Sequence, residues 1–127
     1  MLEDQPQSDA WIHVVDDDQG VRTSIELLLR TLGYRSRAYP CAEAFLENFE
    51  PCNRHCLILD LQLPGMTGVD LQLELQARGI SIAVIAMTGG APRDLIQRSR
   101  QAGALAVLAK PFRLDSLEPL IREAFQS

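Results

Sequence analysis

Short apolar runs alternate with longer segments of mixed polarity along the whole chain. Four of the runs are nearly continuous in apolar residues and the second is weaker, and they cover residues 11–15, 34–39, 56–61, 81–88 and 104–109. Runs of this length without regular polar interruption are typical of strands buried on both faces of a parallel sheet. The pattern therefore predicts five strands.

The segments between these runs repeat their apolar residues at helical spacing. After the first run, Val21, Ile25, Leu28 and Leu32 recur three or four residues apart until Gly33, a residue suited to end a helix. The other predicted helices cover residues 41–49, 69–76, 92–102 and about 114–125.

Periodicity alone does not settle two of these helices. Residues 69–76 alternate strictly, which is typical of a half-buried strand, but leucine, glutamine and glutamate favour a helix. In a helix, Leu71 and Leu75 would share the core face while Leu73 points outward. In the last helix, Pro119 removes a backbone donor and crowds the carbonyl four residues earlier, so the regular part is predicted to begin near Pro119.

Alternating strands and helices predict an α/β fold. The expected architecture is flavodoxin-like (βα)5, a doubly wound five-stranded parallel sheet with helices on both faces. Residues 11–127 form this one domain, and the polar, aperiodic residues 1–10 are predicted to be a disordered N-terminal extension. Because ligands bind beyond the carboxyl ends of the strands in such sheets, the chemistry should be sought there.

Composition narrows the possible functions. The 127 residues suit one globular domain with a real core and leave no room for a second. A net charge of −5 argues against direct nucleic-acid binding by this domain, since such binding relies on clustered lysine and arginine. The three cysteines lack a disulfide-rich spacing, and no signal peptide or membrane-spanning run is visible, so the sequence predicts a cytoplasmic protein without a membrane partner.

Charged and hydroxyl side chains follow four of the five predicted strands. These residues are Asp16, Asp17, Asp60, Thr88 and Lys110. Two carboxylates about 4 Å apart repel by roughly 4 kcal/mol at an effective dielectric constant of about 20, so the cluster needs a cation, and Mg²⁺ prefers such oxygen ligands. With a metal present, Asp60 could attack phosphorus while Lys110 and Thr88 donate to the phosphoryl oxygens.

The third aspartate of the "DDD" triplet, Asp18, opens the first predicted helix. There its carboxylate can cap exposed N–H groups and meets the positive end of the helix dipole. We therefore assign Asp18 a structural role. His13 and His55 lie in or next to strands and are assigned to local hydrogen bonds rather than to the site.

Four motifs occur in order at the ends of four apolar runs: "VVDDD", "LILDLQLPGMTG", "AMTGG" and "LAKPF". Together they resemble the receiver domain of two-component response regulators, over roughly residues 10–126. The nitrogen-fixation and LuxR-type regulators look most similar. The resemblance implies a signalling domain rather than an enzyme, in which Asp60 accepts phosphate from a sensor histidine kinase.

The same resemblance implies a Mg²⁺ site built from three carboxylates and one backbone carbonyl, those of Asp16, Asp17, Asp60 and Gln62. Asp16 would act there mainly through water. Thr88 and Lys110 would sense the phosphoryl group. The peptide bond between Lys110 and Pro111 would be cis.

One departure from the family pattern lies three residues before Lys110, where Val107 replaces the usual tyrosine or phenylalanine. Without a ring to rotate, activation is predicted to displace the loop 88–92 and the helix after it. That helix carries three arginines against one acid: Arg93, Arg98 and Arg100. They form either a solvated face or a partner surface, which the resemblance implies for a phosphorylation-dependent homodimer or an output contact.

Three other functions compete with this interpretation. A hydrolase of the haloacid dehalogenase type needs a second aspartate two residues after the first, where the chain has Gln62. A flavodoxin-like FMN protein would offer hydroxyls and amides to phosphate rather than three anions. The third is a receiver-like module that binds a partner independently of phosphate. Control of transcription would require an output domain, which is absent from this chain.

Overall fold

The computed structural model of the chain describes residues 10–50 and 54–126. Within them, five strands alternate with five helices: β1 (Ala10–Val15), α1 (Gln19–Thr31), β2 (Arg35–Tyr39), α2 (Ala42–Asn48), β3 (Arg54–Asp60), α3 (Gly68–Ala77), β4 (Ala83–Thr88), α4 (Arg93–Gln101), β5 (Ala106–Ala109) and α5 (Leu114–Gln126). The extension predicted over residues 1–10 lies outside the described residues, except that Ala10 is the first residue of β1.

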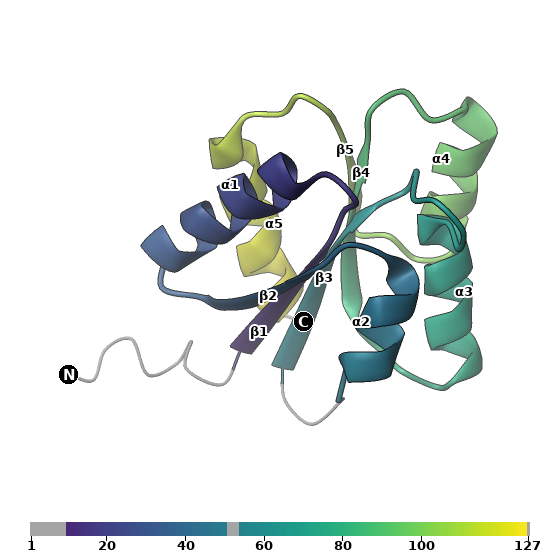
Figure 1. Cartoon of the computed structure of the whole chain (residues 1–127), viewed down its shortest axis with the longest axis horizontal. Helices are drawn as coiled ribbons and strands as arrows, with labels where there is room; N and C mark the ends of the chain where they lie inside the picture. Colours follow the sequence, from purple (N-terminus) through teal and green to yellow (C-terminus); the bar gives the residue numbers. More distant parts are fainter. Residues whose placement is uncertain (1–9, 51–53, 127) are drawn as a thin grey trace.

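All five strands pair in parallel in one sheet of order β2-β1-β3-β4-β5. Figure 1 shows α1 and α5 on one face of the sheet and α2, α3 and α4 on the other. This strand order is the one expected of a flavodoxin-like doubly wound sheet. The fold predicted from the alternating pattern is therefore confirmed.

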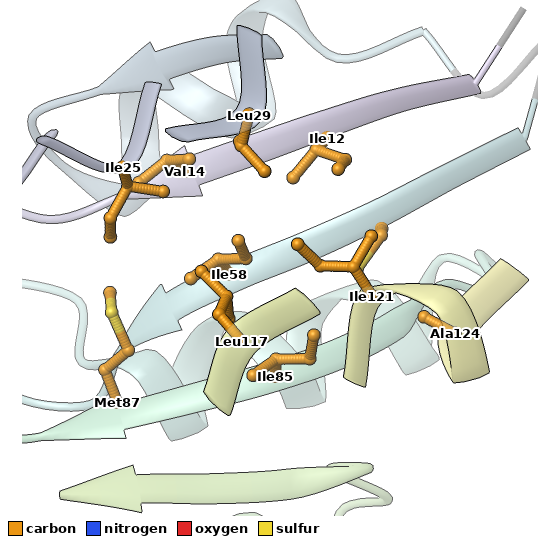
Figure 2. Close-up of a cluster of buried hydrophobic side chains, with 11 residues drawn as sticks. Ile12, Val14, Ile25, Leu29, Ile58, Ile85, Met87, Leu117, Ile121 and Ala124 are labelled. Carbon is orange, nitrogen blue, oxygen red and sulfur yellow. The ribbon is translucent and has the colours of Figure 1, made fainter. Parts of the chain in front are cut away.

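The core lies in two layers because each central strand is apolar on both faces. On one face, strands β1, β3 and β4 pack against α1 and α5 (Figure 2), through Ile12, Val14, Ile25, Leu29, Ile58, Ile85, Met87, Leu117, Ile121 and Ala124. On the other face, Val15, Leu57 and Leu59 pack against Phe45 of α2 and Leu71 of α3. Each large side chain buried in this way stabilises the fold by about 1.5–3 kcal/mol.

Helix α3 confirms the prediction made for the alternating segment. Leu71 and Leu75 are buried, whereas Leu73 is 45% exposed. The start of the helix is fixed by a reciprocal pair of hydrogen bonds, in which the Asp70 N–H donates to Thr67 Oγ1 and the Thr67 N–H donates to Asp70 Oδ2. This capping box supplies a local helix signal that the alternation of leucine and polar residues obscures.

Helix α5 begins at Leu114, as predicted, but it is helical from that residue onward, so the prediction that its regular part begins near Pro119 is wrong. The missing N–H of Pro119 deprives only the carbonyl of Asp115 of its helical partner, and both residues are exposed, so water can bond to that carbonyl. Leu117 and Ile121 are fully buried on the opposite side of the helix and hold it on the sheet.

None of the helices in the described part of the chain combines the length and apolar character needed to cross a bilayer.

Candidate functional site

The carboxyl ends of four neighbouring strands bring the predicted site residues to one edge of the sheet. Asp60 and Thr88 are the last residues of β3 and β4, while Asp16 and Lys110 directly follow β1 and β5. Asp16, Asp60 and Thr88 are buried, with 0%, 4% and 5% of their surface exposed. The parallel order of the strands thus gathers residues that are up to 94 positions apart in the sequence.

Three carboxylates form the acidic centre of this edge. Asp16, Asp17 and Asp60 each offer an oxygen, and these oxygens lie within 4.8 Å of one another. Two of the residues are buried and Asp17 is exposed, so the cluster is open to solvent on one side. A set of hard oxygen ligands with access to water fits Mg²⁺, which retains several of its waters when it binds to proteins.

Lys110 offsets the repulsion between the two buried carboxylates. Its Nζ donates to Asp16 Oδ2 at 2.7 Å and to Asp60 Oδ2 at 2.9 Å. Burial raises the pKa of Asp60, and its hydrogen bonds from Gln62 and Lys110 offset that effect only in part. Burial would lower the pKa of Lys110, but the hydrogen bonds to Asp16 and Asp60 outweigh it and raise the pKa. The ammonium therefore stays charged.

The aspartate triplet divides into three roles. Asp16 Oδ1 accepts the N–H of Asp18 at 2.9 Å, which fixes the turn after β1. Asp18 caps α1, because its carboxylate accepts the N–H of Val21 at 3.2 Å. This confirms the structural role predicted for Asp18 and leaves Asp17 as the exposed member of the acidic cluster.

The loop after Asp60 also donates a hydrogen bond to the Asp60 carboxylate. The N–H of Gln62 donates to Asp60 Oδ1 at 2.9 Å, so the Gln62 backbone lies beside the cluster. Gly68, at the start of α3, packs so closely that a Cβ there would lie 2.6 Å from the carbonyl oxygen of Asp60. A side chain at position 68 would therefore displace the backbone of Asp60.

Two further side chains support the site and were missed in the sequence. Arg22 of α1 donates from Nη1 to the carbonyl oxygen of Asp16 at 2.7 Å. Glu43 of α2 accepts the N–H of Met66, in the loop after Asp60, at 3.4 Å. The role of Arg22 could have been predicted from its position one helical turn after the aspartate triplet. The contact of Glu43 with Met66 could not, because it depends on how α2 packs against the sheet.

Thr88 holds the loop that follows β4. Its Oγ1 accepts the N–H of Ala91 at 2.8 Å and that of Gly90 at 3.3 Å. Val107 of β5 is half-buried, and like Leu95 of α4 it packs against the buried cluster that includes Leu61 and Ala86. The peptide bond between Lys110 and Pro111 is cis.

The three arginines of α4 are exposed and do not share one face. Arg93 and Arg100 are seven residues apart and therefore lie on the same side of the helix. Arg98 instead borders a shallow groove of about 190 Å³ between α3 and α4, together with Leu73 and Gln76. All three are outside the acidic cluster, so any role in binding a partner is separate from the chemistry at Asp60.

Comparison with known proteins agrees with this geometry. The model of the response regulator receiver domain family matches residues 12–122. The transcriptional regulatory protein FixJ of Azorhizobium caulinodans is 41% identical over 101 residues, which cover 80% of this chain and 48% of FixJ. The response regulator protein TmoT of Ectopseudomonas mendocina is 35% identical over 115 residues, covering 91% of this chain and 52% of TmoT. The chain spans about half the length of the curated relatives it matches.

Solved structures of other proteins have the same fold as this chain. The crystal structure of FixJ-N superposes with a TM-score of 0.86 at 31% identity, covering 94% of this chain and 95% of that one. The response regulator StyR superposes with a TM-score of 0.87 at 35% identity, covering 94% of this chain and 60% of that one. The chain therefore belongs to the response regulator receiver domain family of two-component systems, and it is related to FixJ-type transcriptional regulators.

Proposed function

We propose that this receiver domain is a Mg²⁺-dependent phosphoacceptor and that Asp60 accepts the phosphoryl group from a phosphohistidine of a sensor histidine kinase. The observation that carries the proposal is the meeting of Asp60 with Asp16, Asp17 and Lys110 at one partly open edge of the sheet. A carboxylate alone is a poor site for a phosphoryl group, but one beside a fixed ammonium and a cation site can receive it.

In the transfer, a carboxylate oxygen of Asp60 forms a bond to phosphorus as the phosphorus–nitrogen bond of the donor breaks. The bonding electrons remain on the departing imidazole nitrogen, which later takes up a proton. Mg²⁺, held by Asp16, Asp17, Asp60 and the Gln62 carbonyl, would offset the negative charge of the phosphoryl oxygens. Lys110 is already fixed against Asp60 and can donate to one of these oxygens.

Thr88 links the new charge to the molecular surface. Its Oγ1 now accepts the N–H groups of Gly90 and Ala91. When the hydroxyl turns to donate to a phosphoryl oxygen, these two N–H groups lose their acceptor, and the loop 88–92 is free to shift. Because Val107 offers no ring to rotate, we place the surface change in this loop and in α4.

The surface change would alter a partner contact on α4, in a phosphorylation-dependent homodimer or with an output domain that controls transcription. Arg93, Arg98 and Arg100 give this side of an acidic protein a local positive charge. Such a side favours an acidic partner surface. Reversing Arg98 and Arg100 to glutamate should weaken phospho-induced association measured by sedimentation, and unchanged association would argue against this surface.

Acetyl phosphate tests the proposed chemistry without the cognate kinase. Incubated with acetyl phosphate and Mg²⁺, the wild-type protein should gain the mass of one phosphoryl group, and omission of Mg²⁺ should prevent the gain. Asp60→Asn, which keeps the size of the side chain but replaces one carboxylate oxygen with an amide NH2 group, should show no gain. A wild-type protein that stays unmodified would favour the alternative function, a receiver-like module that binds its partner independently of phosphate.

The identity of the proposed kinase partner indicates the cellular compartment in which the phosphoryl transfer would occur. A histidine kinase presents its phosphohistidine in the cytoplasm, and we place this domain there. The acidic surface charge makes direct nucleic-acid binding by the domain unfavourable, so any control of transcription would act through another domain.

A further inference from the structure

Helices α3 and α4 are joined by buried polar side chains in a contact that is otherwise apolar. Ser99 Oγ donates to Gln72 Oε1 at 2.7 Å, and Gln72 Nε2 donates to the Ser99 carbonyl oxygen at 3.2 Å. The two residues are 0% and 2% exposed, respectively. One turn further on, Gln76 Nε2 donates to the carbonyl oxygen of Ala102 at 2.7 Å. We call these three hydrogen bonds the α3–α4 bridge.

The α3–α4 bridge lies at one end of α4 only. Ser99 belongs to the last turn of α4, and Ala102 is its C-cap residue. At the other end, Leu95 and Ile96 pack against an apolar cluster that includes Leu61. Among the described residues, the side chains of 93–97 make no hydrogen bond to another element. The end of α4 that follows the Thr88 loop is thus held by apolar contacts alone.

These two kinds of contact respond differently to a small displacement. Apolar contacts are non-directional, so a helix can slide over them at little cost. A buried hydrogen bond is directional, and breaking it leaves a buried donor or acceptor without a partner. A shift that begins at Thr88 therefore meets little resistance at Leu95 and strong resistance at Ser99.

We propose that Gln72 and Ser99 are positioning residues that fix the C-terminal half of α4 to α3, so that activation tilts α4 about Ser99 instead of moving the whole helix. The proposal rests on the proposed function, because it takes the release of the Thr88 loop as the start of the motion. It places the surface change at Arg93, Asp94 and Gln97, and it leaves Arg98 and Arg100 nearly in place.

Hydrogen exchange followed by NMR tests the tilt, with beryllofluoride and Mg²⁺ standing in for the phosphoryl group. The Ala91 N–H, once released by Thr88, should exchange about tenfold faster, as expected for the loss of one hydrogen bond. The side-chain amide hydrogens of Gln72 and Gln76 should change by less than about twofold, because their hydrogen bonds to the carbonyl oxygens of Ser99 and Ala102 persist. Equal acceleration at Ala91 and at the Gln72 side chain would overturn the proposal.

The double variant Gln72→Met/Ser99→Ala removes the buried pair while keeping the volume of the contact similar. In this variant the exchange response to beryllofluoride should spread to the side-chain amide of Gln76, whose hydrogen bond to the Ala102 carbonyl oxygen is the remaining part of the α3–α4 bridge. Gln101→Met is the matched control, because it makes the same chemical change at an exposed position of α4 and should leave the wild-type pattern. If the double variant folds poorly, Ser99→Ala alone should give the same spread to a smaller degree. A response that stays confined to the Thr88 loop in both variants would contradict the role of the pair.

The outcomes separate this proposal from the proposed function. If acetyl phosphate modifies Asp60 and the Thr88 loop responds, but Gln72 is released as well, only the tilt fails. If acetyl phosphate leaves Asp60 unmodified and beryllofluoride leaves the Thr88 loop unchanged, both proposals are overturned.

Discussion

Strands β1 and β3 bring together two pairs of polar side chains, of which one is ionised and the other is neutral. At the carboxyl ends, Asp16 and Asp60 are bridged by the Lys110 ammonium. Nearer the amino ends, His13 and His55 are hydrogen-bonded to each other, with 2.9 Å between His13 Nε2 and His55 Nδ1. The same two strands therefore present an ionised cluster at their carboxyl ends and a pair of imidazoles further back along their length.

The imidazole pair is neutral, and the buried member, His13, has a hydrogen-bond partner at each ring nitrogen. His13 Nδ1 lies 3.0 Å from the hydroxyl oxygen of Tyr39, so both nitrogens of His13 have partners. The rings of Phe45 and Phe49 meet His13 edge-on, at centroid distances of 5.2 and 5.3 Å. Burial, and then the nearby His55 and Arg37, lower the pKa of His13 to about 4. Its hydrogen bonds and aromatic contacts leave this pair with no need for a ligand.

The acidic cluster differs because its charges are only partly offset. Three carboxylates share one ammonium, and one carboxylate faces solvent. A cation can therefore enter and improve the local electrostatics, which no ion would do at the imidazole pair. Polar residues on the same two strands can therefore serve structure in one place and offer a site for chemistry in the other. The balance of charge and the access of solvent decide which of these two roles the residues have.

The largest effect is expected from removing the ammonium of the acidic cluster. Lys110→Met leaves Asp16 and Asp60 buried without their opposite charge, so it should lower the free energy of unfolding by about 3 kcal/mol at neutral pH. Chemical denaturation measures this loss. Mg²⁺ should restore more stability to Lys110→Met than it adds to the wild type, because it replaces the missing positive charge. An unchanged midpoint without Mg²⁺ would show that the cluster does not depend on Lys110.

A smaller effect is expected from protonating the imidazole pair. The pKa of His13 is 6.5 in the unfolded chain and about 4 in the folded one, so the unfolded state binds more protons between these values. Stability from this group is complete above pH 6.5 and is lost as the pH falls towards 4, and the loss reaches about 2 kcal/mol at pH 5. Denaturation curves of the wild type and His13→Gln across this range measure the difference. Parallel pH profiles for the two proteins would contradict the assignment.

The smallest effects separate the last two members of the aspartate triplet, Asp17 and Asp18. Asp18→Ala should cost about 1 kcal/mol of stability through the lost helix cap and leave the affinity for Mg²⁺ nearly unchanged. Asp17→Asn should do the reverse, weakening Mg²⁺ binding by about tenfold or more while stability changes little, since Asp17 is exposed. Calorimetric titration with Mg²⁺ and thermal denaturation of both variants test the pair. Equal effects of the two variants on Mg²⁺ binding would contradict the assignment of metal binding to Asp17 and helix capping to Asp18.

The fold and the acidic cluster could be predicted because their signals are local. Each buried strand is an apolar run, and each site residue ends such a run or follows it within two residues, so a parallel sheet brings them together whatever the details of packing. Asp18 as a helix cap follows from the same local logic. The regular part of α5 was wrongly predicted to begin near Pro119, because the exposure of Pro119, which makes its missing N–H tolerable, is set by how the helix lies on the sheet.

Other contacts could not be read from the sequence because they depend on the relative placement of distant elements. His13 and His55 are 42 residues apart and meet only through the pairing of β1 with β3. Gln72 and Ser99 meet because two helices pack at one particular register, and neither belongs to a motif. The sequence grouped the arginines of α4 as one patch, whereas helical geometry turns Arg98 towards α3.

The central claim is that the ionised end of the sheet is a phosphoacceptor centred on Asp60, and chemical trapping tests it most directly. The wild-type protein is treated with acetyl phosphate and Mg²⁺, reduced with borohydride, digested and mapped by mass spectrometry. Borohydride converts an aspartyl phosphate to homoserine. We predict homoserine at position 60 alone, and only when Mg²⁺ is present. Homoserine at position 16 or 17, or none at all, would contradict the account.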